Sequence, residues 1–478
     1  MRTEVVDVCV IGSGAGGAVI AYEAARRGLR TLVVERGPYV RSHEMTHGEC
    51  EMFARLYKDG ALQMSTSMDL FILQGAAVGG STVLANMVMF RTPEPVLDDW
   101  ASFGANLHRA ALGRSFERIE RALGVSDRPD PANVSPSSRF LMQGARAIGL
   151  EPRWMPKAVG DCLGCGGCNI GCVFGRKRSA LTTYIPWAEE NGARVLADTT
   201  VERIEHRRGR ATGLLARNGR GERLRILARQ IVVACGAIGS PGLLLGSGIE
   251  RNVGTRVSFN VGALLMLEYD EPIDDFDGDQ MTAYAAGPGY TIEPVHQGPM
   301  TTALSTPGWF DEHAALMRRF RHHTFATALV PTRPVGRVVR SRLFGHEETR
   351  FRMPDADLAT LRRGLAATAR TFFAAGARRV YLPTQEINAV DRPDRLDVID
   401  RVMTSPRRFN MGSAHPQGGV PISDDPSVGA IDSSFAVHGF ENLFVCDASV
   451  FPSSVGVNPI ESIMALADYA APRILARA

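Results

Sequence analysis

A length of 478 residues exceeds what one hydrophobic core usually supports, so we expect two interlocked domains. The composition is that of a globular protein, with 45% apolar and 22% charged residues, and a net charge of +3 argues against a nucleic-acid partner. No stretch approaches the ~20 apolar residues of a membrane span, and the N-terminus leads into a strand pattern rather than a signal peptide. We therefore expect a cytoplasmic protein whose eight cysteines are thiols or metal ligands rather than disulfides.

The first 35 residues predict a β-α-β unit. An apolar strand is followed by a helix pattern over about residues 14–27 and by a second apolar strand over residues 29–35. The turn between the first strand and the helix fits G-x-G-x-x-G at Gly12, Gly14 and Gly17.

This glycine turn and the acid that follows it indicate a dinucleotide-binding site. The glycines permit a tight turn, close approach of a pyrophosphate, and close contact between helix and strand. The pyrophosphate would lie on the N-terminus of the helix, where unpaired N–H groups favour negative charge. Glu35 follows Gly17 by 18 residues, at the end of the second strand, where a carboxylate accepts hydrogen bonds from an adenosine ribose. The motif itself does not distinguish FAD from NAD.

The rest of the chain alternates between glycine-rich, helical and strand patterns. Residues 75–91 are rich in glycine, residues 96–150 carry mostly helical patterns, and residues 160–176 form a cysteine-rich loop. Further strands are expected at residues 194–196, 201–206 and 230–235. Residues 260–410 contain no glycine fingerprint and are the best candidate for a substrate-facing domain, whereas the pattern of a cofactor domain returns from His415 onward.

Three later segments resemble the flavin-contacting segments of the glucose–methanol–choline (GMC) oxidoreductases. They are G-A-A-V-G-G-S-T at residues 75–82 with Asn86 and F-R-T-P at 90–93, G-A-I-G-S-P at 236–241, and C-D-A-S-V-F-P at 446–452. The similarity runs along the whole chain and is weakest in residues 260–410. Within the family, the chain looks closest to the cholesterol-oxidase and bacterial fatty-alcohol-oxidase branch.

The resemblance implies an α/β fold: a Rossmann-like FAD-binding domain, and an α+β substrate domain whose antiparallel sheet covers the flavin. The FAD-binding domain is expected to be discontinuous and to comprise residues 1–95, 190–260 and 411–478. A helical segment would span 96–159, a cysteine-rich loop 160–180, and the substrate domain 261–410. The residues expected to bind FAD are Gly12, Gly14, Gly17, Glu35, Gly79, Gly80, Ser81, Asn86, Val201, Cys235, Gly236, Asp447, Ala448, Asn458, Pro459 and Ile460.

The resemblance also implies a catalytic pair. His415, in S-A-H-P-Q-G-G, and Asn458, in V-G-V-N-P, occupy the positions of the family's histidine and its histidine-or-asparagine. Oxidation of an alcohol requires the hydroxyl proton to leave while a hydride moves to flavin N5. His415 can accept a proton near neutral pH, whereas Asn458 cannot titrate and can only orient the substrate oxygen. The helix that begins near Pro459 resembles the one whose N-terminus faces the flavin, where its positive potential would stabilise the reduced form.

Four cysteines follow the spacing C-x2-C-x2-C-x3-C of a ferredoxin-type iron–sulfur run, without the usual proline after the last. They are Cys162, Cys165, Cys168 and Cys172. The first three could hold a 3Fe-4S cluster, whereas a 4Fe-4S cluster would need Cys172 or a distant ligand. Plain thiols, a disulfide and zinc are the alternatives, and a single compact run fits zinc less well. A cluster would favour a dehydrogenase with a protein or quinone as electron acceptor, and oxygen is the simpler acceptor without one.

We expect the substrate to be a small-molecule alcohol, and a short acidic segment is relevant to which alcohol it is. Its acids are Glu268, Asp270, Glu271, Asp274, Asp275, Asp277 and Asp279. A solvated loop is the simpler interpretation, and attraction of a cationic substrate such as an amino sugar is the sharper hypothesis. The resemblance otherwise permits sugars, cyclitols, sterols and long-chain alcohols. A flavin-dependent lyase or decarboxylase and an electron-transfer flavoprotein are alternative functions, but the pair of His415 and Asn458 favours alcohol oxidation.

Overall fold

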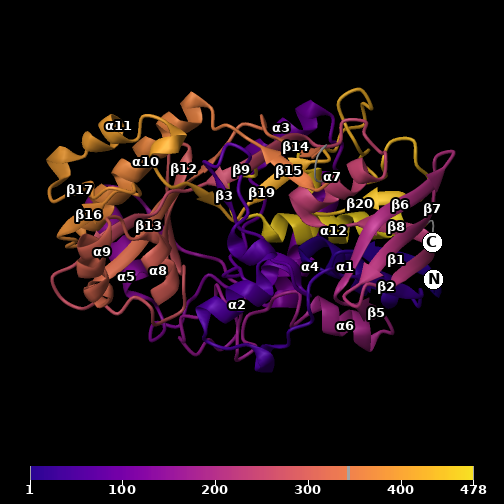
Figure 1. Ribbon diagram of the computed structural model, residues 1–478, viewed down its shortest axis with the longest axis horizontal. Helices are drawn as coiled ribbons and strands as arrows, with labels where there is room; N and C mark the ends of the chain where they lie inside the picture. Colours follow the sequence, from indigo (N-terminus) through magenta and orange to yellow (C-terminus); the bar gives the residue numbers. More distant parts are fainter. Residues whose placement is uncertain (1, 342–344, 477–478) are drawn as a thin grey trace.

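The computed structural model describes residues 2–341 and 345–476, which form two regions that are each built on one large sheet (Figure 1). Both chain ends lie beside a seven-stranded sheet, and a nine-stranded sheet makes up the other region. The predicted α/β fold with an antiparallel substrate sheet is confirmed. Within the described ranges, no helix is both long enough and apolar enough to cross a membrane.

The seven-stranded sheet has the order β5-β2-β1-β8-β7-β6, and β20 pairs with the end of β8. Its parallel strands are β1 (Arg2–Ile11), β2 (Thr31–Val34), β5 (Arg194–Leu196), β8 (Arg223–Val233) and β20 (Leu443–Val445), and its antiparallel strands are β6 (Thr199–Arg207) and β7 (Arg210–Asn218). Ile11 lies opposite both Val34 and Val233, and Val445 lies opposite Val233. The parallel strands therefore end together, and the loops that follow them meet at one edge, where sheets of this kind bind cofactors.

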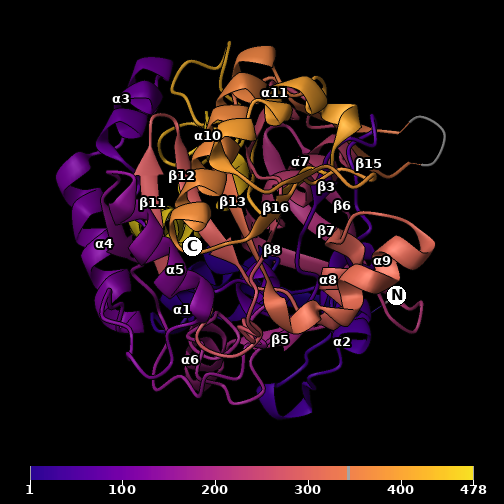
Figure 2. The same cartoon turned by 90° about the vertical axis from the view of Figure 1, so that its left-hand side faces the viewer.

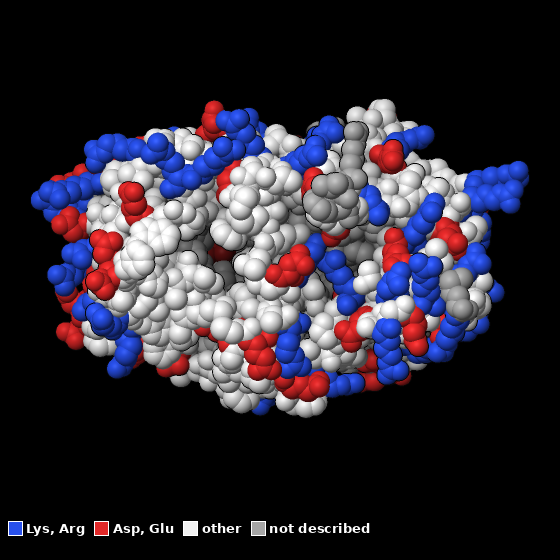
Figure 3. All heavy atoms as spheres, in the orientation of Figure 1, with Lys and Arg blue, Asp and Glu red and all other residues white. Residues whose placement is uncertain are grey.

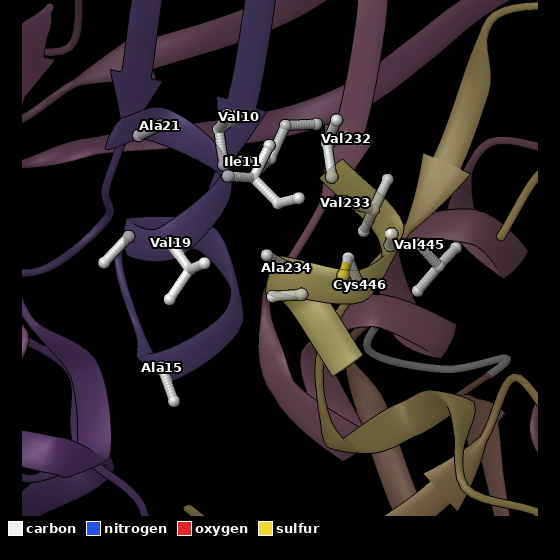
Figure 4. Close-up of a cluster of buried hydrophobic side chains, with 14 of the residues drawn as sticks. Val10, Ile11, Ala15, Val19, Ala21, Val232, Val233, Ala234, Val445 and Cys446 are labelled. Atoms are coloured by element: carbon white, nitrogen blue, oxygen red, sulfur yellow. The ribbon is translucent and has the colours of Figure 1, made fainter. Parts of the chain in front are cut away.

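Continuous apolar strands form the core of this region because helices cover the parallel sheet. Helix α1 (Ala15–Ala25) packs against α12 (Ile460–Leu475) and α6 (Tyr184–Glu190), and α12 packs against α4 (Arg109–Leu123). Side chains of Val10, Ile11, Val232, Val233 and Val445 gather at the ends of three neighbouring strands (Figure 4). The β-α-β unit predicted from the first 35 residues is confirmed, with the helix and the second strand a few residues shorter than expected.

The nine-stranded sheet has the order β17-β16-β10-β13-β12-β11-β4, and its strand pairs are antiparallel. Its strands are β17 (Ala389–Val390), β16 (Arg379–Tyr381), β10 (Leu265–Glu268), β13 (His323–Pro331), β12 (Tyr290–Val295), β11 (Ala283–Gly287) and β4 (Pro152–Trp154). Helices α10 (Asp355–Ala374) and α5 (Pro136–Ala147) cover one face of it (Figure 2). Because side chains alternate along a strand, Ile292 faces these helices and Glu293 faces the opposite side, toward the first region.

Strands β9 (Thr255–Val261) and β19 (Pro416–Gly419) complete the second sheet. Nearly all of their residues fall within segments that the sequence assigns to the FAD-binding domain. Near residues 260 and 415, these segments therefore contribute strands to the nine-stranded sheet. The remaining main elements are α2 (Glu49–Leu56), β3 (Phe71–Ile72), α3 (Glu94–Phe103), α7 (Gly236–Gly246), α8 (Pro299–Ser305), α9 (Phe310–Arg318), β14 (Arg337–Arg340), β15 (Glu347–Arg350), α11 (Val398–Val402) and β18 (Gly412–Ser413). As predicted, the cysteine-rich segment contains only turns and isolated bridges.

Candidate active site

A cavity of about 1460 Å³ lies between the two sheets. The ends of β1, β2 and β8 line one side, and residues of β12 and β13, including Glu293, Thr327 and Leu329, line the other. The space-filling view shows a hollow near the middle of the molecule that is bordered mainly by uncharged residues (Figure 3). Of the predicted FAD-binding residues, only Gly17 and Gly79 do not line the cavity, and both support residues that do.

The glycine turn leaves the N-terminus of α1 open to the cavity. Gly12 has a φ of +100°, and a Cβ there would lie 2.3 Å from the carbonyl oxygen of Ala234. A Cβ on Gly80 would lie 2.8 Å from Cα of Gly14, so the two glycine-rich loops meet only without side chains. No side chain caps the first turn of α1 at Gly14. Its N–H groups are therefore available to a pyrophosphate, which fits this cradle.

Glu35 fixes this turn and lies at the cavity wall. Its Oε2 accepts hydrogen bonds from the backbone N (3.0 Å) and Oγ (2.8 Å) of Ser13, and its Oε1 accepts one from Gly37 N (2.9 Å). Ser13 Oγ in turn accepts a hydrogen bond from Gly79 N (2.9 Å). Glu35 thus joins the glycine turn to the second glycine-rich segment through Ser13, and its role as the ribose acid stays a prediction.

The C-terminal segment closes the flavin end of the cavity. Asp447 is buried and accepts hydrogen bonds from Gly236 N (2.8 Å) and Ser449 N (2.7 Å). Burial raises the pKa of its carboxyl. Pro459 and Ile460, at the start of α12, line the cavity beside it. The N-terminus of α12 therefore faces the cavity.

The two predicted catalytic residues face the same cavity and share one neighbour that the sequence did not single out, Asn260 at the end of β9. Asn260 Nδ2 lies 3.4 Å from His415 Nδ1 and donates a hydrogen bond of 2.7 Å to the carbonyl oxygen of Val457, next to Asn458. Burial lowers the pKa of His415 to about 4. His415 is therefore neutral at pH 7, which is the form that can accept a proton.

Glu293 is a further polar residue at this site that sequence reasoning missed. Its side chain is 2% exposed, and it forms a hydrogen bond with the side chain of Asn458. Burial raises the pKa of Glu293 to about 8, so the carboxyl is protonated at neutral pH. Oδ1 of Asn458 is buried and has no hydrogen-bond partner within the described residues, which leaves an acceptor for a substrate hydroxyl. An acid between the apolar residues Ile292 and Pro294 of β12 is the signal that could have identified Glu293.

The cysteine-rich loop forms part of the wall behind the substrate side. Asn169 lines the cavity, accepts a hydrogen bond from Asn86 Nδ2 (3.1 Å) and donates one to the carbonyl oxygen of His296 (3.2 Å). Tyr57 donates a hydrogen bond of 2.7 Å to the carbonyl oxygen of Asn169. The four predicted metal ligands do not line the cavity themselves.

None of the four cysteines of this loop forms a disulfide with another described residue. Burial raises the pKa of Cys162 to about 11 and also raises that of Cys168, which favours the neutral thiol. The buried Lys177 donates hydrogen bonds to the carbonyl oxygens of Val83 (2.5 Å) and Cys168 (2.7 Å), and burial lowers its pKa to about 8. Across residues 2–341 and 345–476, no three His, Cys, Asp or Glu side chains are grouped so that they could hold a metal ion.

The acidic segment lies outside the cavity. None of its acids lines the cavity. Glu268 is buried and pairs with Arg319 (2.7 Å), and Asp274 pairs with Arg321 (2.6 Å). Asp275 is also buried, and it accepts a hydrogen bond from Ser137 N (2.7 Å). The buried acids of the segment are therefore structural, whereas Glu271 and Asp277 are exposed, and none of the acids lies at the cavity, where the amino-sugar hypothesis needs them.

One cavity thus receives the glycine turn, the N-terminus of α12 and the pair of His415 and Asn458, and this arrangement defines an FAD-dependent oxidoreductase. A family profile described as FAD binding domain matches residues 7–48, and profiles described as GMC oxidoreductase match residues 53–265 and 334–467. The chain belongs to the GMC oxidoreductase family.

Known proteins similar to this chain agree with the family. An uncharacterized GMC-type oxidoreductase of Mycobacterium tuberculosis is 32% identical, over 98% of this chain and 76% of the relative. A long-chain-alcohol oxidase of Arabidopsis thaliana is 27% identical (98% of this chain, 67% of the relative), and a cholesterol oxidase of M. tuberculosis is 26% identical (97% and 90%). The solved structure of pyridoxine 4-oxidase from Mesorbium loti has a TM-score of 0.75 at 16% identity, covers 98% of both chains, and supports the fold.

Proposed function

We propose that this protein oxidises an alcohol to an aldehyde or ketone by hydride transfer to FAD. The observation that carries the proposal is that His415 and Asn458 line the same cavity and that the buried Oδ1 of Asn458 has no partner among the described residues. FAD, when bound, supplies the hydride acceptor. The residues of the chain bind the alcohol, orient its carbon and take its proton.

Each polar residue at the site has a separate task in this proposal. His415, neutral at pH 7, accepts the hydroxyl proton at its ring nitrogen and becomes an imidazolium. Asn458 Oδ1 accepts the hydrogen bond that orients the hydroxyl. Protonated Glu293 fixes the Asn458 amide without adding a negative charge that would oppose flavin reduction. Asn260 connects the two loops that carry the catalytic pair.

We infer that the substrate is a long-chain alcohol or a sterol rather than a sugar. The substrate side of the cavity is lined by aromatic and aliphatic side chains, namely Phe53, Tyr57, Met300, Leu304 and Leu329. Leu62 and Leu304 also line the cavity and are 77% and 73% exposed, so its mouth is apolar. The relatives named long-chain-alcohol oxidase and cholesterol oxidase support the same class.

A chain-length series tests the substrate class. Burial of one methylene contributes about 0.8 kcal/mol, so kcat/KM for primary alcohols should rise roughly fourfold per added methylene until the cavity is filled. Sugars and amino sugars should reduce the flavin far more slowly. A series with no dependence on chain length would contradict the apolar site.

The electron acceptor depends on the cysteine loop. We propose oxygen as the acceptor, because the relatives named above are oxidases and no three His, Cys, Asp or Glu side chains within residues 2–341 and 345–476 are grouped so that they could hold a metal ion. The spacing of the run remains the support for an iron–sulfur cluster and a protein or quinone acceptor. An absorption spectrum of anaerobically purified protein, with iron and labile sulfide assays, separates the two. Stoichiometric iron and sulfide would overturn the assignment of oxygen.

A further inference from the structure

Glu461 is a buried acid that the alcohol-oxidation mechanism does not use. It lies in the first turn of α12, the helix whose N-terminus faces the cofactor space through Pro459, Ile460 and Ile463. Its side chain is 1% exposed and extends to the other side of the helix, where it contacts Glu120 of α4. A titratable group therefore lies within one turn of the helix end that faces the flavin.

Glu461 and Glu120 form a hydrogen-bonded carboxyl pair. Ionised carboxylates only accept hydrogen bonds, so this bond requires a proton on one of the two. Arg91 donates two hydrogen bonds of 2.6 Å to Glu120, which stabilise the negative charge on Glu120 and leave the proton on Glu461. Oε1 of Glu461 is buried without a partner in the described part of the chain, which a neutral acid tolerates better than a carboxylate.

The charges around Glu461 act in opposite directions. Glu120 raises the pKa of Glu461, whereas Arg91, from the segment before α3, lowers it. Glu117, also on α4, is a charged neighbour of Arg91. Burial, followed by the bond to Glu120, raises the pKa of Glu461 to about 8. The hydrogen bond from Arg91 is the main cause of the lowered pKa of Glu120.

We propose that Glu461 tunes the reduction potential of the flavin through this shared proton. While Glu461 is protonated, the positive potential at the N-terminus of α12 acts fully on the reduced flavin, which carries negative charge after uptake of two electrons and one proton. When Glu461 loses its proton to solvent, its negative charge opposes flavin reduction. A unit charge at ~10 Å in an effective dielectric of about 20 changes the reduction equilibrium roughly tenfold. The inference rests on FAD binding at α12 and on no particular substrate.

The test is the midpoint potential of FAD in the holoprotein between pH 6.5 and 9.5, measured against reference dyes for the wild type and Glu461→Gln. The two proteins should have the same potential at pH 6.5. Above pH 8 the wild type should fall below the variant by a roughly tenfold change in equilibrium constant, or about 30 mV for two electrons. The proposal would be overturned if the midpoint potentials of the two proteins changed in parallel over the whole pH range. A difference between the two potentials that is already present at pH 6.5 would also overturn it.

Glu120→Gln is the matched variant, because it removes the charge that holds the proton and frees Arg91. In this variant, the fall in the FAD midpoint potential that follows loss of the Glu461 proton should occur at a lower pH than in the wild type. A fall at the same pH as in the wild type would contradict a proton shared between Glu461 and Glu120. If Glu461→Gln fails to fold, Glu293→Gln still provides a test, because it removes the other acid whose pKa is raised to about 8: its infrared spectrum should show a protonated carboxyl at pH 7 that disappears by pH 9.5. Its absence at pH 7 would also overturn the proposal. These readouts use chemical reductants, so they do not depend on whether an alcohol reduces the flavin.

Discussion

Replacement of Glu293 by Gln should stabilise the protein at neutral pH and preserve most of its activity. Burial raises the pKa of Glu293 from 4.5 to about 8, so the folded protein holds a proton at pH 7 that the unfolded chain releases. Folding therefore takes up a proton, and the free energy of unfolding falls by about 1.4 kcal/mol per pH unit between pH 4.5 and 8. At pH 7 the loss is about 3 kcal/mol. Gln has the same shape and no charge, and it avoids this loss.

The assay is denaturant unfolding of the FAD-bound wild type and Glu293→Gln at pH 5, 7 and 8.5, with activity measured alongside. The free energy of unfolding of Glu293→Gln should exceed that of the wild type by a small amount at pH 5. This difference should increase up to pH 8 and then remain constant. Glu268→Gln is the matched control, since Glu268 lies in the same sheet but pairs with Arg319 and has a lowered pKa. Glu268 stabilises the fold above pH 4.5 and loses that contribution as the pH falls, so Glu268→Gln should destabilise at pH 7.

This reasoning would be refuted if Glu293→Gln were less stable than the wild type at pH 7. It would also be refuted if the variant changed the free energy of unfolding by the same amount at pH 5 and pH 8. A loss of more than about a hundredfold in kcat, with unchanged FAD binding, would instead assign the role of base to Glu293 rather than to His415.

Three further predictions concern the catalytic base and the cofactor cradle. His415→Ala should lower kcat by about 10²–10⁴ while FAD stays bound, as kinetics and the flavin spectrum would show. Because burial lowers the pKa of His415 to about 4, the wild-type kcat/KM profile should lack a limb near pH 6.5, and such a limb would contradict its neutral state. Gly80→Ala should weaken FAD binding at least tenfold in a dissociation titration, because its Cβ would lie 2.8 Å from Gly14 Cα, whereas Gly113→Ala meets no atom within 4 Å and should leave FAD binding unchanged.

The cofactor half of the fold could be predicted from the sequence because its signals are local. The glycine turn and Glu35 lie within one β-α-β unit, where spacing alone determines which groups meet. The parallel strands are short apolar runs that end together, so the residues that follow them converge. His415 and Asn458 came from resemblance in short motifs, and the structure brings both to the cavity.

The rest of the site depends on contacts between distant segments. Glu293 meets Asn458 only because β12 faces the other sheet, and Glu461 meets Glu120 only because α12 packs on α4. The pairing of the acidic segment could not be predicted for the same reason, since the arginines that pair with Glu268, Asp270 and Asp274 come from elsewhere in the chain. Strand β9 sits in the substrate sheet because its partners are β13 and β19, which a domain boundary at residue 260 does not anticipate.

The most direct test of alcohol oxidation is anaerobic, single-turnover reduction of the bound FAD by a long-chain primary alcohol. The alcohol is used with hydrogen and then with deuterium on the carbinol carbon. We predict bleaching of the flavin band by the alcohol, a several-fold slower rate with deuterium, and loss of the reaction in His415→Ala. A flavin that dithionite bleaches but no long-chain alcohol or sterol reduces would contradict the proposed function.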